Sequence, residues 1–471
     1  MKIGELTHCF FCTGARNQSL LREINSTAIT FEIDERIASF KALGMAKVLN
    51  RPIAVYTTSG TAVSECLSAL IEAHLSEVPL LLITADRPKR MQGSGAPQTI
   101  DHEIITRGYR KTYLELNPEE LKRIDLNSLV YPAHINVVIE GKDEIQNLKS
   151  SSYESNWSGF EKFLKDHPRP VIILSHANQK AEDVFSRLTD LKLPLYAEVM
   201  SGLHHRSPIR FEEDLLQGLK SGKFTSVIRI GHTPLTKLWR MLEGLHLPVF
   251  SFDSRNLPAL SYGAVMPLGC SDLLNQKPFW MLLKEMTPFE IELRSTEQLL
   301  KLLHEFPDSE VSTLASLQER IPEGSDIYLG NSLTIRFFEL IQSRRYRIWG
   351  NRGVNGIDGQ LATAKGIALG LGSPLYCILG DLTLLYDLSS MMDLPENLKL
   401  IIINNKGGRI FETLKMPQEI VLAHENNFEA IASAFDLSYA RNNLSHLSDV
   451  AVMELTPDNQ QTMELLKRWQ G

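Results

Sequence analysis

Short apolar runs alternate with stretches of helical periodicity along almost the whole chain. The runs have the length and the aliphatic, β-branched composition of buried strands, and many are bounded by glycine, proline or asparagine. Predicted strands cover residues 28–33, 53–57, 79–84, 133–139, 170–175, 195–199, 226–230, 248–252, 374–379 and 398–403. Strands that alternate with helices are typical of α/β domains, in which helices flank a parallel sheet.

The same pattern predicts several domains. A chain of 471 residues is too long for a single core by the usual relation between length and domain number. The polar stretch at 141–167, rich in serine and lysine, is predicted to be a linker, and the periodicity at 295–323 predicts a helical connector. We therefore expect three successive α/β domains, at 1–150, 165–292 and 300–471.

Composition excludes several classes of protein. Hydrophobic residues make up 43% of the chain and charged residues 22%, as in ordinary globular proteins. The net charge of −7 and a pI of about 6.0 give no basic surface for nucleic acid. The first residues lack the apolar core of a signal peptide, and no apolar run approaches the roughly 18 residues of a membrane span. We expect a cytoplasmic protein.

The cysteines give no disulfide framework. There are five, scattered along the chain, and only Cys9 and Cys12 are close in sequence, with CxxC spacing. A zinc site would need a second pair of ligands at suitable spacing, and none follows. A redox dithiol is the alternative, but both residues lie in or beside an apolar run, which favours buried structural thiols.

Two of the predicted strands end in polar residues that suit a metal ion. The run at 374–379 leads into Gly380 and Asp381, and the run at 398–403 into the sequence NNKGG at 404–408. Ligands of open α/β sheets bind beyond the carboxyl ends of the strands, so these ends offer a carboxylate, an amide and a glycine carbonyl to one small volume. Hard oxygen donors of this kind suit Mg²⁺ that holds a diphosphate. The alternative is that Asp381 caps a helix and Asn404 and Asn405 form a turn.

The sequences GDLTLLYDL (380–388) and NNKGGRIF (404–411) resemble the metal–diphosphate motif of thiamine-diphosphate enzymes, and in particular of the MenD family, the 2-succinyl-5-enolpyruvyl-6-hydroxy-3-cyclohexene-1-carboxylate synthases. The resemblance implies an aminopyrimidine-binding domain, a central domain, shortened here, and a diphosphate- and metal-binding domain. It assigns Mg²⁺ or Mn²⁺ to Asp381, Asn405 and Gly407. It places the following residues against thiamine diphosphate: Gly380, Leu382, Gly408 and Ile410.

A second resemblance lies in the first domain. The segment DERIASFKALGMAK (34–47) is similar to a helix of the family that presents a glutamate to N1′ of the aminopyrimidine, which implies that role for Glu35. A buried carboxyl has a raised pKa, so it can share or donate a proton near neutrality. Taken alone, Glu35 is equally a first-turn acid favoured by the helix dipole. In TTSGTAV (57–63), the hydroxyls of Thr58 and Ser59 are expected to meet the cofactor ring.

The resemblance also assigns substrate contacts, many of them arginines. An arginine fork holds a carboxylate at two points, although an isolated arginine is more often a surface ion-pair partner. The acceptor contacts implied are Arg16 in TGAR, Arg87 in TADRP and Gln98 in GAPQ, and Lys237 in GHTPLTK is implied as a further substrate contact. The donor contacts implied are Ser332 and Arg336 in NSLTIR and Arg352 in NRGVNGIDG. Asn355 is expected at the diphosphate, Ile357 as the apolar wedge under the cofactor, and Ile410 and Phe411 along the substrate cavity.

The implied reaction joins two carboxylic acids. 2-Oxoglutarate loses CO₂ on thiamine diphosphate, and the four-carbon unit adds to the ring of isochorismate, a step of menaquinone biosynthesis. In the superfamily two subunits share each site, so a homodimer or a dimer of dimers is expected. The chain departs from the family at Ala15, Pro97 and Leu238. Two alternatives therefore stay open: another thiamine-diphosphate decarboxylase or carboligase with a different acceptor, and a non-catalytic subunit that binds the cofactor.

Overall fold

The computed structural model divides into two compact units, each formed by several segments of the chain. Unit 1 comprises Met1–Ser150, Gly350–Ile402 and Asn426–Glu454, and unit 2 comprises Ser151–Trp349, Ile403–Glu425 and Leu455–Gly471. The structure describes residues 2–14, 16–21, 24, 28–86, 100–139, 157–175, 180–232, 234, 238, 242, 247–256, 264–288, 296–414 and 416–470. The three domain ranges expected from the sequence stay a prediction.

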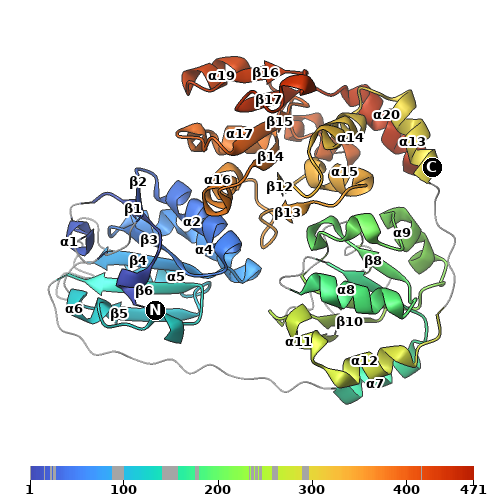
Figure 1. The fold of residues 1–471 in the computed structure, drawn as a ribbon, viewed down its shortest axis with the longest axis horizontal. Coiled ribbons are helices and arrows are strands. Elements are labelled where there is room, and N and C mark those ends of the chain that lie inside the picture. The colour runs from blue at the N-terminus through green and yellow to red at the C-terminus, as the bar shows by residue number, and fades with distance from the viewer. Residues whose placement is uncertain are drawn as a thin grey trace. The chain divides into compact units, whose positions relative to one another are not determined.

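Three parallel sheets form the framework (Figure 1). The first has the order β2 (Ile29–Glu32), β1 (Cys9–Cys12), β3 (Ile53–Thr57), β4 (Leu80–Asp86), β6 (Ala133–Val138) and β5 (Thr112–Leu116). The second has the order β11 (Ala264–Met266), β10 (Val249–Phe252), β9 (Ser226–Ile230), β7 (Pro170–Leu174) and β8 (Leu195–Ala197). The third has the order β13 (Arg347–Trp349), β12 (Asp326–Leu329), β14 (Leu375–Gly380), β15 (Leu398–Ile403), β17 (Val452–Leu455) and β16 (Tyr439–Arg441).

Helices follow most strands, as the α/β pattern predicts. In unit 1 they are α1 (Gln18–Leu21), α2 (Glu35–Leu49), α3 (Thr61–Glu65), α4 (Leu67–Ser76), α5 (His102–Thr106), α6 (Pro118–Leu121), α16 (Gln360–Leu371), α17 (Asp381–Tyr386) and α19 (Phe428–Ala434). In unit 2 they are α7 (Trp157–Asp166), α8 (Ala181–Asp190), α9 (Glu212–Lys220), α11 (Cys270–Leu274), α12 (Lys277–Lys284), α13 (Thr296–Glu305), α14 (Glu310–Arg320), α15 (Leu333–Ile341), α18 (Ile410–Thr413) and α20 (Asn459–Gln470).

All ten predicted strands are confirmed, and so is the helical connector, which forms α13 and α14. The predicted linker at 141–167 is wrong over its second part, because Trp157–Asp166 form α7. Phe160 and Leu164 of this helix are buried in the core of the second sheet, and their apolar spacing is hidden among polar neighbours. Residues 140–156 lie outside the part of the chain that the structure describes.

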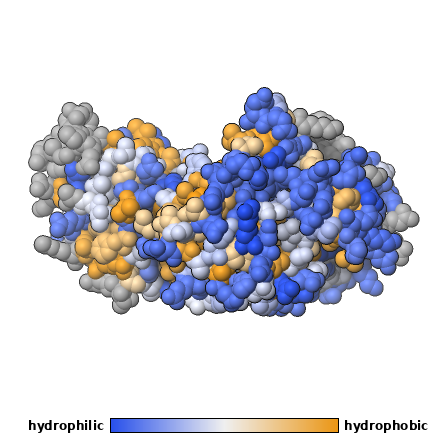
Figure 2. All heavy atoms as spheres, turned by 90° about the horizontal axis from the view of Figure 1, so that it is seen from above, coloured by the Kyte–Doolittle hydropathy of each residue, from blue (hydrophilic) through white to orange (hydrophobic). Residues whose placement is uncertain are grey.

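Apolar side chains cover both faces of the first and second sheets. One face of the first sheet packs on α2 and α4, and the other on residues such as Leu121 and Leu126. The five cysteines are buried and unpaired, and burial raises the pKa of Cys9 to about 12, as expected of structural thiols. Mainly hydrophilic side chains cover the face in Figure 2, with scattered hydrophobic patches. No described helix is long and apolar enough to cross a membrane.

Within unit 1, α2 and α16 pack at very short range because each has a glycine at the crossing. A Cβ on Gly44 would lie 2.0 Å from the carbonyl oxygen of Thr363, and one on Gly366 would lie 1.9 Å from that of Lys41. No side chain fits at either position, so only glycine allows this approach. The crossing fixes α2, whose first residue is Glu35, against the segment 350–402.

Candidate active site

Glu35 lies in the first turn of α2, directly after the edge strand β2. The helix begins at Asp34, whose side chain accepts a hydrogen bond of 3.0 Å from the backbone N–H of Ile37. Burial raises the pKa of the Glu35 carboxyl, and the nearby carboxylates of Asp34 and Glu65 act in the same direction. Glu35 is therefore a half-buried acid that keeps its proton to higher pH than a free glutamate.

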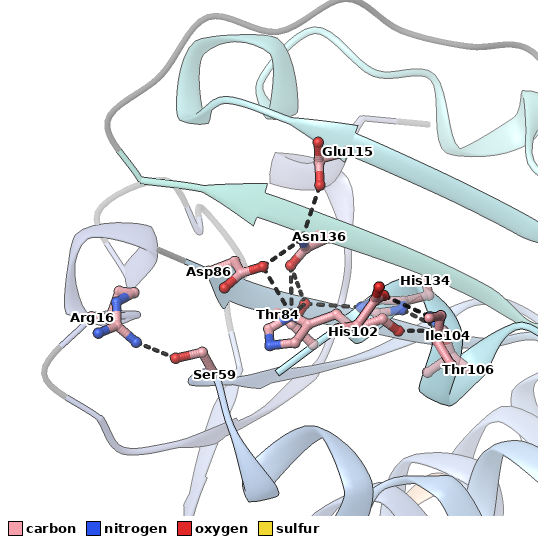
Figure 3. A network of polar contacts seen from close by, with 11 residues as sticks. Arg16, Ser59, Thr84, Asp86, His102, Ile104, Thr106, Glu115, His134 and Asn136 are labelled. Atoms are coloured by element: carbon pink, nitrogen blue, oxygen red, sulfur yellow. Dashed lines mark hydrogen bonds and ion pairs between the residues drawn. The ribbon is translucent and has the colours of Figure 1, made fainter. Parts of the chain in front are cut away.

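Thr58 and Ser59 lie at the carboxyl end of β3, in the centre of the first sheet, and both are buried. The chain after β1 comes close to them, since a Cβ on Gly14 would lie 2.7 Å from Cβ of Thr58. The guanidinium of Arg16 donates a hydrogen bond to the hydroxyl of Ser59 (Figure 3). The structure thus brings together three of the predicted site residues, Arg16, Thr58 and Ser59.

A buried polar network lies beside them, at the end of β4 (Figure 3). The Asp86 carboxylate accepts a hydrogen bond of 3.0 Å from Nδ2 of Asn136 and lies 3.6 Å from Nδ1 of His102. Thr84 links Asn136 to His134, at 2.8 and 2.9 Å, and burial holds the pKa of His134 well below its usual value. Thr84 and Asp86 lie in the segment TADRP, but the sequence does not reveal that they join a network, because the other members come from β6 and α5.

Arg87 follows the network directly in the chain, but its placement lies outside the described residues. The same holds for Gln98 and Lys237, and for Ala15 and Pro97, at which the chain departs from the family. The roles expected for them stay predictions. Leu238, the third departure, is fully buried and packs with Val171, Val227 and other side chains against the second sheet. An apolar residue at 238 therefore contributes to the core.

The glycine-rich loop at 350–359 carries Arg352, Asn355 and Ile357. Asn355 has a φ of 60°, in the left-handed region that asparagine tolerates, and the Ile357 side chain is 37% exposed. The side chain of Gln360, at the start of α16, donates a hydrogen bond of 2.6 Å to the carbonyl of Gly356. The structure thus presents an apolar side chain at the surface of this loop, and the role of Ile357 as a wedge stays a prediction.

Asp381 is buried and begins α17, directly after β14. One of its carboxylate oxygens accepts a hydrogen bond of 2.6 Å from the N–H of Leu382. The end of the same helix is tied to α2, because Arg36 pairs with Asp387 at 2.8 Å. Asp387 also accepts hydrogen bonds of 2.9 Å from the N–H of Ala362 and the hydroxyl of Ser390. The helix that Asp381 begins is therefore held against the helix that Glu35 begins.

In unit 2, the two asparagines after β15 do different things. The side-chain oxygen of Asn404 accepts a hydrogen bond of 3.2 Å from the N–H of Lys406, so the turn expected as the alternative exists at Asn404. The amide nitrogen of Asn405 donates a hydrogen bond of 2.8 Å to the buried carboxylate of Glu310 on α14. Oδ1 of Asn405 is buried and has no hydrogen-bond partner among the described residues. Unlike Asn404, Asn405 presents an unused oxygen.

The backbone after Asn405 is shaped by close packing. Lys406 has a φ of 61° and Gly407 a φ of 130°, and a Cβ on Gly407 would lie 2.7 Å from the carbonyl oxygen of Val421. The carbonyl of Asn405 accepts hydrogen bonds of 2.9 Å from both Asn459 and Arg409. A buried, unpartnered amide oxygen beside a fixed glycine loop fits the donor set that a divalent cation needs.

The remaining predicted residues of unit 2 lie in two further helices. Ser332 precedes α15 with a φ of 77°, and its carbonyl accepts a hydrogen bond of 2.8 Å from the guanidinium of Arg336. Ile410 and Phe411 begin α18 and are partly buried. Gly408 leaves room for the ring of Phe411, since a Cβ on Gly408 would lie 3.1 Å from that ring. Sequence reasoning missed Glu310, which no motif marks.

Comparisons with known proteins identify the family. Residues 2–105 match the family model described as "Thiamine pyrophosphate enzyme, N-terminal TPP binding domain". The 2-succinyl-5-enolpyruvyl-6-hydroxy-3-cyclohexene-1-carboxylate synthase of Bdellovibrio bacteriovorus is 34% identical, over 99% of this chain and 97% of that protein. The enzyme of the same name from Akkermansia muciniphila is 29% identical, over 99% and 96%.

A solved structure supports the fold. The crystal structure of benzoylformate decarboxylase from Polynucleobacter necessarius matches with a TM-score of 0.68 and 12% sequence identity, over 96% of each chain. At that identity the likeness concerns the fold alone. It agrees with three parallel sheets flanked by helices, the architecture expected from the sequence.

Proposed function

Because the chain belongs to the family of 2-succinyl-5-enolpyruvyl-6-hydroxy-3-cyclohexene-1-carboxylate synthases, which are thiamine-diphosphate enzymes, we propose that it catalyses the reaction of that name. In this proposal 2-oxoglutarate is decarboxylated, and the remaining four-carbon unit is added to isochorismate as a step of menaquinone biosynthesis. The family model and the relatives support thiamine diphosphate as the cofactor.

The observation that carries the cofactor part of the proposal is the amide of Asn405. Because its nitrogen is bound to Glu310, its unpartnered oxygen is the atom available to a ligand. Mg²⁺, or Mn²⁺, would be held by Asp381, Asn405 and the main chain of Gly407, and would itself hold the diphosphate. Asp381 follows β14 and Asn405 follows β15, and these strands are neighbours in the third sheet.

When bound, thiamine diphosphate supplies the carbon nucleophile and the electron sink that a decarboxylation followed by carbon–carbon bond formation requires. Glu35 is proposed to hold a proton against N1′ of the aminopyrimidine ring. Its raised pKa suits that task, since a carboxyl that keeps its proton to higher pH than a free glutamate can share it with the ring. Thr58 and Ser59 would line the same ring, and Ile357 would be the apolar wedge that holds the cofactor bent. Gly380, Leu382, Asn355, Gly408 and Ile410 would complete the contacts to the cofactor.

Arginines are proposed to bind the carboxylates of both substrates. Arg336 and Arg352, with Ser332, would hold 2-oxoglutarate, and Arg16, Arg87, Gln98 and Lys237 would hold isochorismate, with Phe411 along the cavity. The hydrogen bond between Arg16 and Ser59 supports this assignment, because it fixes an arginine next to residues proposed for the cofactor. A planar guanidinium held in this way can bind a carboxylate at two points.

The proposal extends to a homodimer or dimer of dimers in the cytoplasm, on the resemblance alone. A different acceptor is the second candidate, and the departures at Ala15 and Pro97 favour it. Leu238 does not, since its burial accounts for an apolar residue at that position.

The test is the loss of isochorismate on addition of purified protein, thiamine diphosphate, Mg²⁺ and 2-oxoglutarate, with each component omitted in turn. We expect consumption only when all are present. Release of CO₂ from 2-oxoglutarate while isochorismate persists would show that the cofactor and donor are right and the acceptor is wrong. Tight binding of the cofactor without either signal would favour a non-catalytic subunit.

A further inference from the structure

Glu72 is a buried carboxylate on α4 that no motif marks, and it contacts the glycine-rich loop far away in the sequence. Its side chain is 1% exposed. Oε1 accepts a hydrogen bond of 3.0 Å from the N–H of Gly353, and Oε2 one of 3.0 Å from the N–H of Val354. The two oxygens thus hold two successive backbone amides, as a bound anion does at a peptide nest.

Further donors complete the surroundings of this carboxylate. The hydroxyl of Ser76, one turn along α4, donates 2.7 Å to Oε1, and Nζ of Lys47 on α2 lies 3.5 Å from the same atom. Lys47 also donates to the carbonyl of Gly350 at 2.8 Å and to Oδ1 of Asn351 at 2.7 Å. The buried pair of Lys47 and Glu72 therefore contacts four of the five positions from 350 to 354, all but Arg352.

The fit leaves no room for a side chain at Gly353. A Cβ at this position would lie 2.7 Å from Oε2 and 3.0 Å from the carbonyl oxygen of Glu72. Glycine is thus required because the backbone lies directly on the carboxylate. This contact fixes the backbone of the loop at one place on α4.

The other end of the loop is fixed by α16. Asn351 donates 2.8 Å to the hydroxyl of Thr363, which itself donates 2.8 Å to the carbonyl of Gly359. Gln360 donates to the carbonyl of Gly356. The residues proposed to contact substrate and cofactor, Arg352, Asn355 and Ile357, therefore lie between two anchored points.

We propose that Glu72, together with Lys47, is a positioning residue that sets the conformation of the loop at 352–357 and through it the affinity for 2-oxoglutarate and thiamine diphosphate. The inference rests on the proposed function and deepens it, because it adds residues that contact neither ligand. A buried ion pair often adds little to the stability of the fold, because removing two charges from water costs free energy. We therefore assign to the pair of Lys47 and Glu72 a role in holding the loop in one conformation.

The first experiment is amide hydrogen exchange on the full-length protein without cofactor. The variant is Glu72→Gln, in which the side chain keeps one acceptor but places an NH₂ group against a backbone N–H. We expect exchange at the amides of Gly353 and Val354 to be at least about tenfold faster than in the wild type, since one of the two amides loses its buried acceptor and meets an NH₂ group, which releases this part of the loop from α4. The control is Glu119→Gln, which removes an exposed carboxylate paired with Lys122, and it should leave these amides unchanged.

The second experiment measures ligand affinity in the same variants. Glu72→Gln should raise the Kd for thiamine diphosphate, measured with Mg²⁺, and the KM for 2-oxoglutarate by about tenfold or more, with a smaller change in kcat. The reason is that Arg352, Asn355 and Ile357 would no longer be held in the position that binds these ligands. If melting temperature falls but exchange, Kd and KM stay within twofold of wild type, the pair has a merely structural role and the proposal is wrong.

Two further variants keep the test decisive. If Glu72→Gln does not fold, the double variant Lys47→Met with Glu72→Gln removes the unpaired charge, and Ser76→Ala removes only one donor to Glu72. Both should still raise the exchange rate and the Kd, Ser76→Ala by less. Unchanged values in both would contradict the proposal. Failure of the proposed reaction is distinguishable, because exchange and cofactor affinity do not require isochorismate turnover.

Discussion

Glu35 and Glu72 are both carboxyl groups on helices that pack on the first sheet, yet their surroundings are opposite. Glu72 receives two backbone N–H groups, a hydroxyl and a lysine. The pKa of Glu35 is raised by burial and by the negative charges of Asp34 and Glu65, which together outweigh the opposing effects of its own backbone N–H and of the hydroxyl of Thr57. Burial alone therefore does not decide what a carboxyl does. A carboxylate held by several donors, like Glu72, can anchor a loop, whereas a carboxyl whose pKa is raised mainly by burial, like Glu35, retains a proton that chemistry can use.

The same contrast distinguishes Asn404 from Asn405, which are adjacent in the chain. Asn404 uses its side-chain oxygen for a turn with the N–H of Lys406. Asn405 uses only its nitrogen, in the contact with Glu310, and its oxygen stays without a described partner. Of the two asparagines, the one proposed to hold the metal ion is the one whose side-chain oxygen has no described partner.

The largest effect is expected from Glu35→Gln. Glutamine keeps the shape of the side chain but cannot share a proton, so we expect turnover to fall by about 10²–10⁴-fold. Exchange of the C2 proton of bound thiamine diphosphate, followed by NMR after mixing with deuterated water, should fall in parallel. The control is Glu65→Gln, which removes a neighbouring charge and should change either rate only a few fold. Normal C2 exchange in Glu35→Gln would contradict the role proposed for Glu35.

A smaller effect is expected from Glu310→Ala. The variant leaves the amide nitrogen of Asn405 without its acceptor, so the amide can rotate away from the orientation that exposes its oxygen. Groups that orient a metal ligand in this way typically contribute about 10–100-fold to metal affinity. We expect the Kd for Mn²⁺, measured by electron paramagnetic resonance with thiamine diphosphate present, to rise by about tenfold.

Glu310→Gln sharpens this comparison, because its side-chain oxygen can still accept from Asn405. Its Mn²⁺ affinity should lie between those of the wild type and Glu310→Ala. Equal affinities in all three proteins would show that Glu310 does not orient Asn405.

The sequence was sufficient for the fold class and for the family. Long buried strands such as β4 and β15 have runs of aliphatic residues, so their pattern is unambiguous. Short strands at or near sheet edges, such as β13 and β16, contain arginine and partly buried positions, and no period distinguishes them from loops. Helix α7 was missed for a related reason, since its few apolar residues lie among serines and lysines.

Glu72 and Glu310 could not be predicted, because their partners are 281 and 95 residues away, at Gly353 and Asn405. Nothing local distinguishes Glu72 from an exposed helix acid. Only the fold brings it to the glycine loop. A motif identifies a functional residue when its neighbours in the sequence belong to the same site. Residues that support a site from distant helices can be identified only from the folded structure.

The smallest effect concerns stability and pH, and it tests the contrast between the two carboxyls directly. The pKa of Glu35 is higher in the folded protein than the ordinary value of 4.5 that applies to the unfolded chain. Between those two pKa values the folded state binds more protons than the unfolded state, so the contribution of Glu35 to the free energy of unfolding falls as the pH rises. Above the folded-state pKa the loss is complete and constant.

Glu35→Gln removes this titration. The cofactor-free variant should therefore melt at the same temperature as the wild type or slightly below it near pH 4, and gain on the wild type as the pH approaches 8. Paired melting curves of the two proteins across that range measure the difference, with Glu119→Gln as the reference for an exposed glutamate. A difference that shrinks with rising pH would mean that donors stabilise the Glu35 carboxylate, as they do that of Glu72, and the distinction between the proton carrier and the anchor would fail.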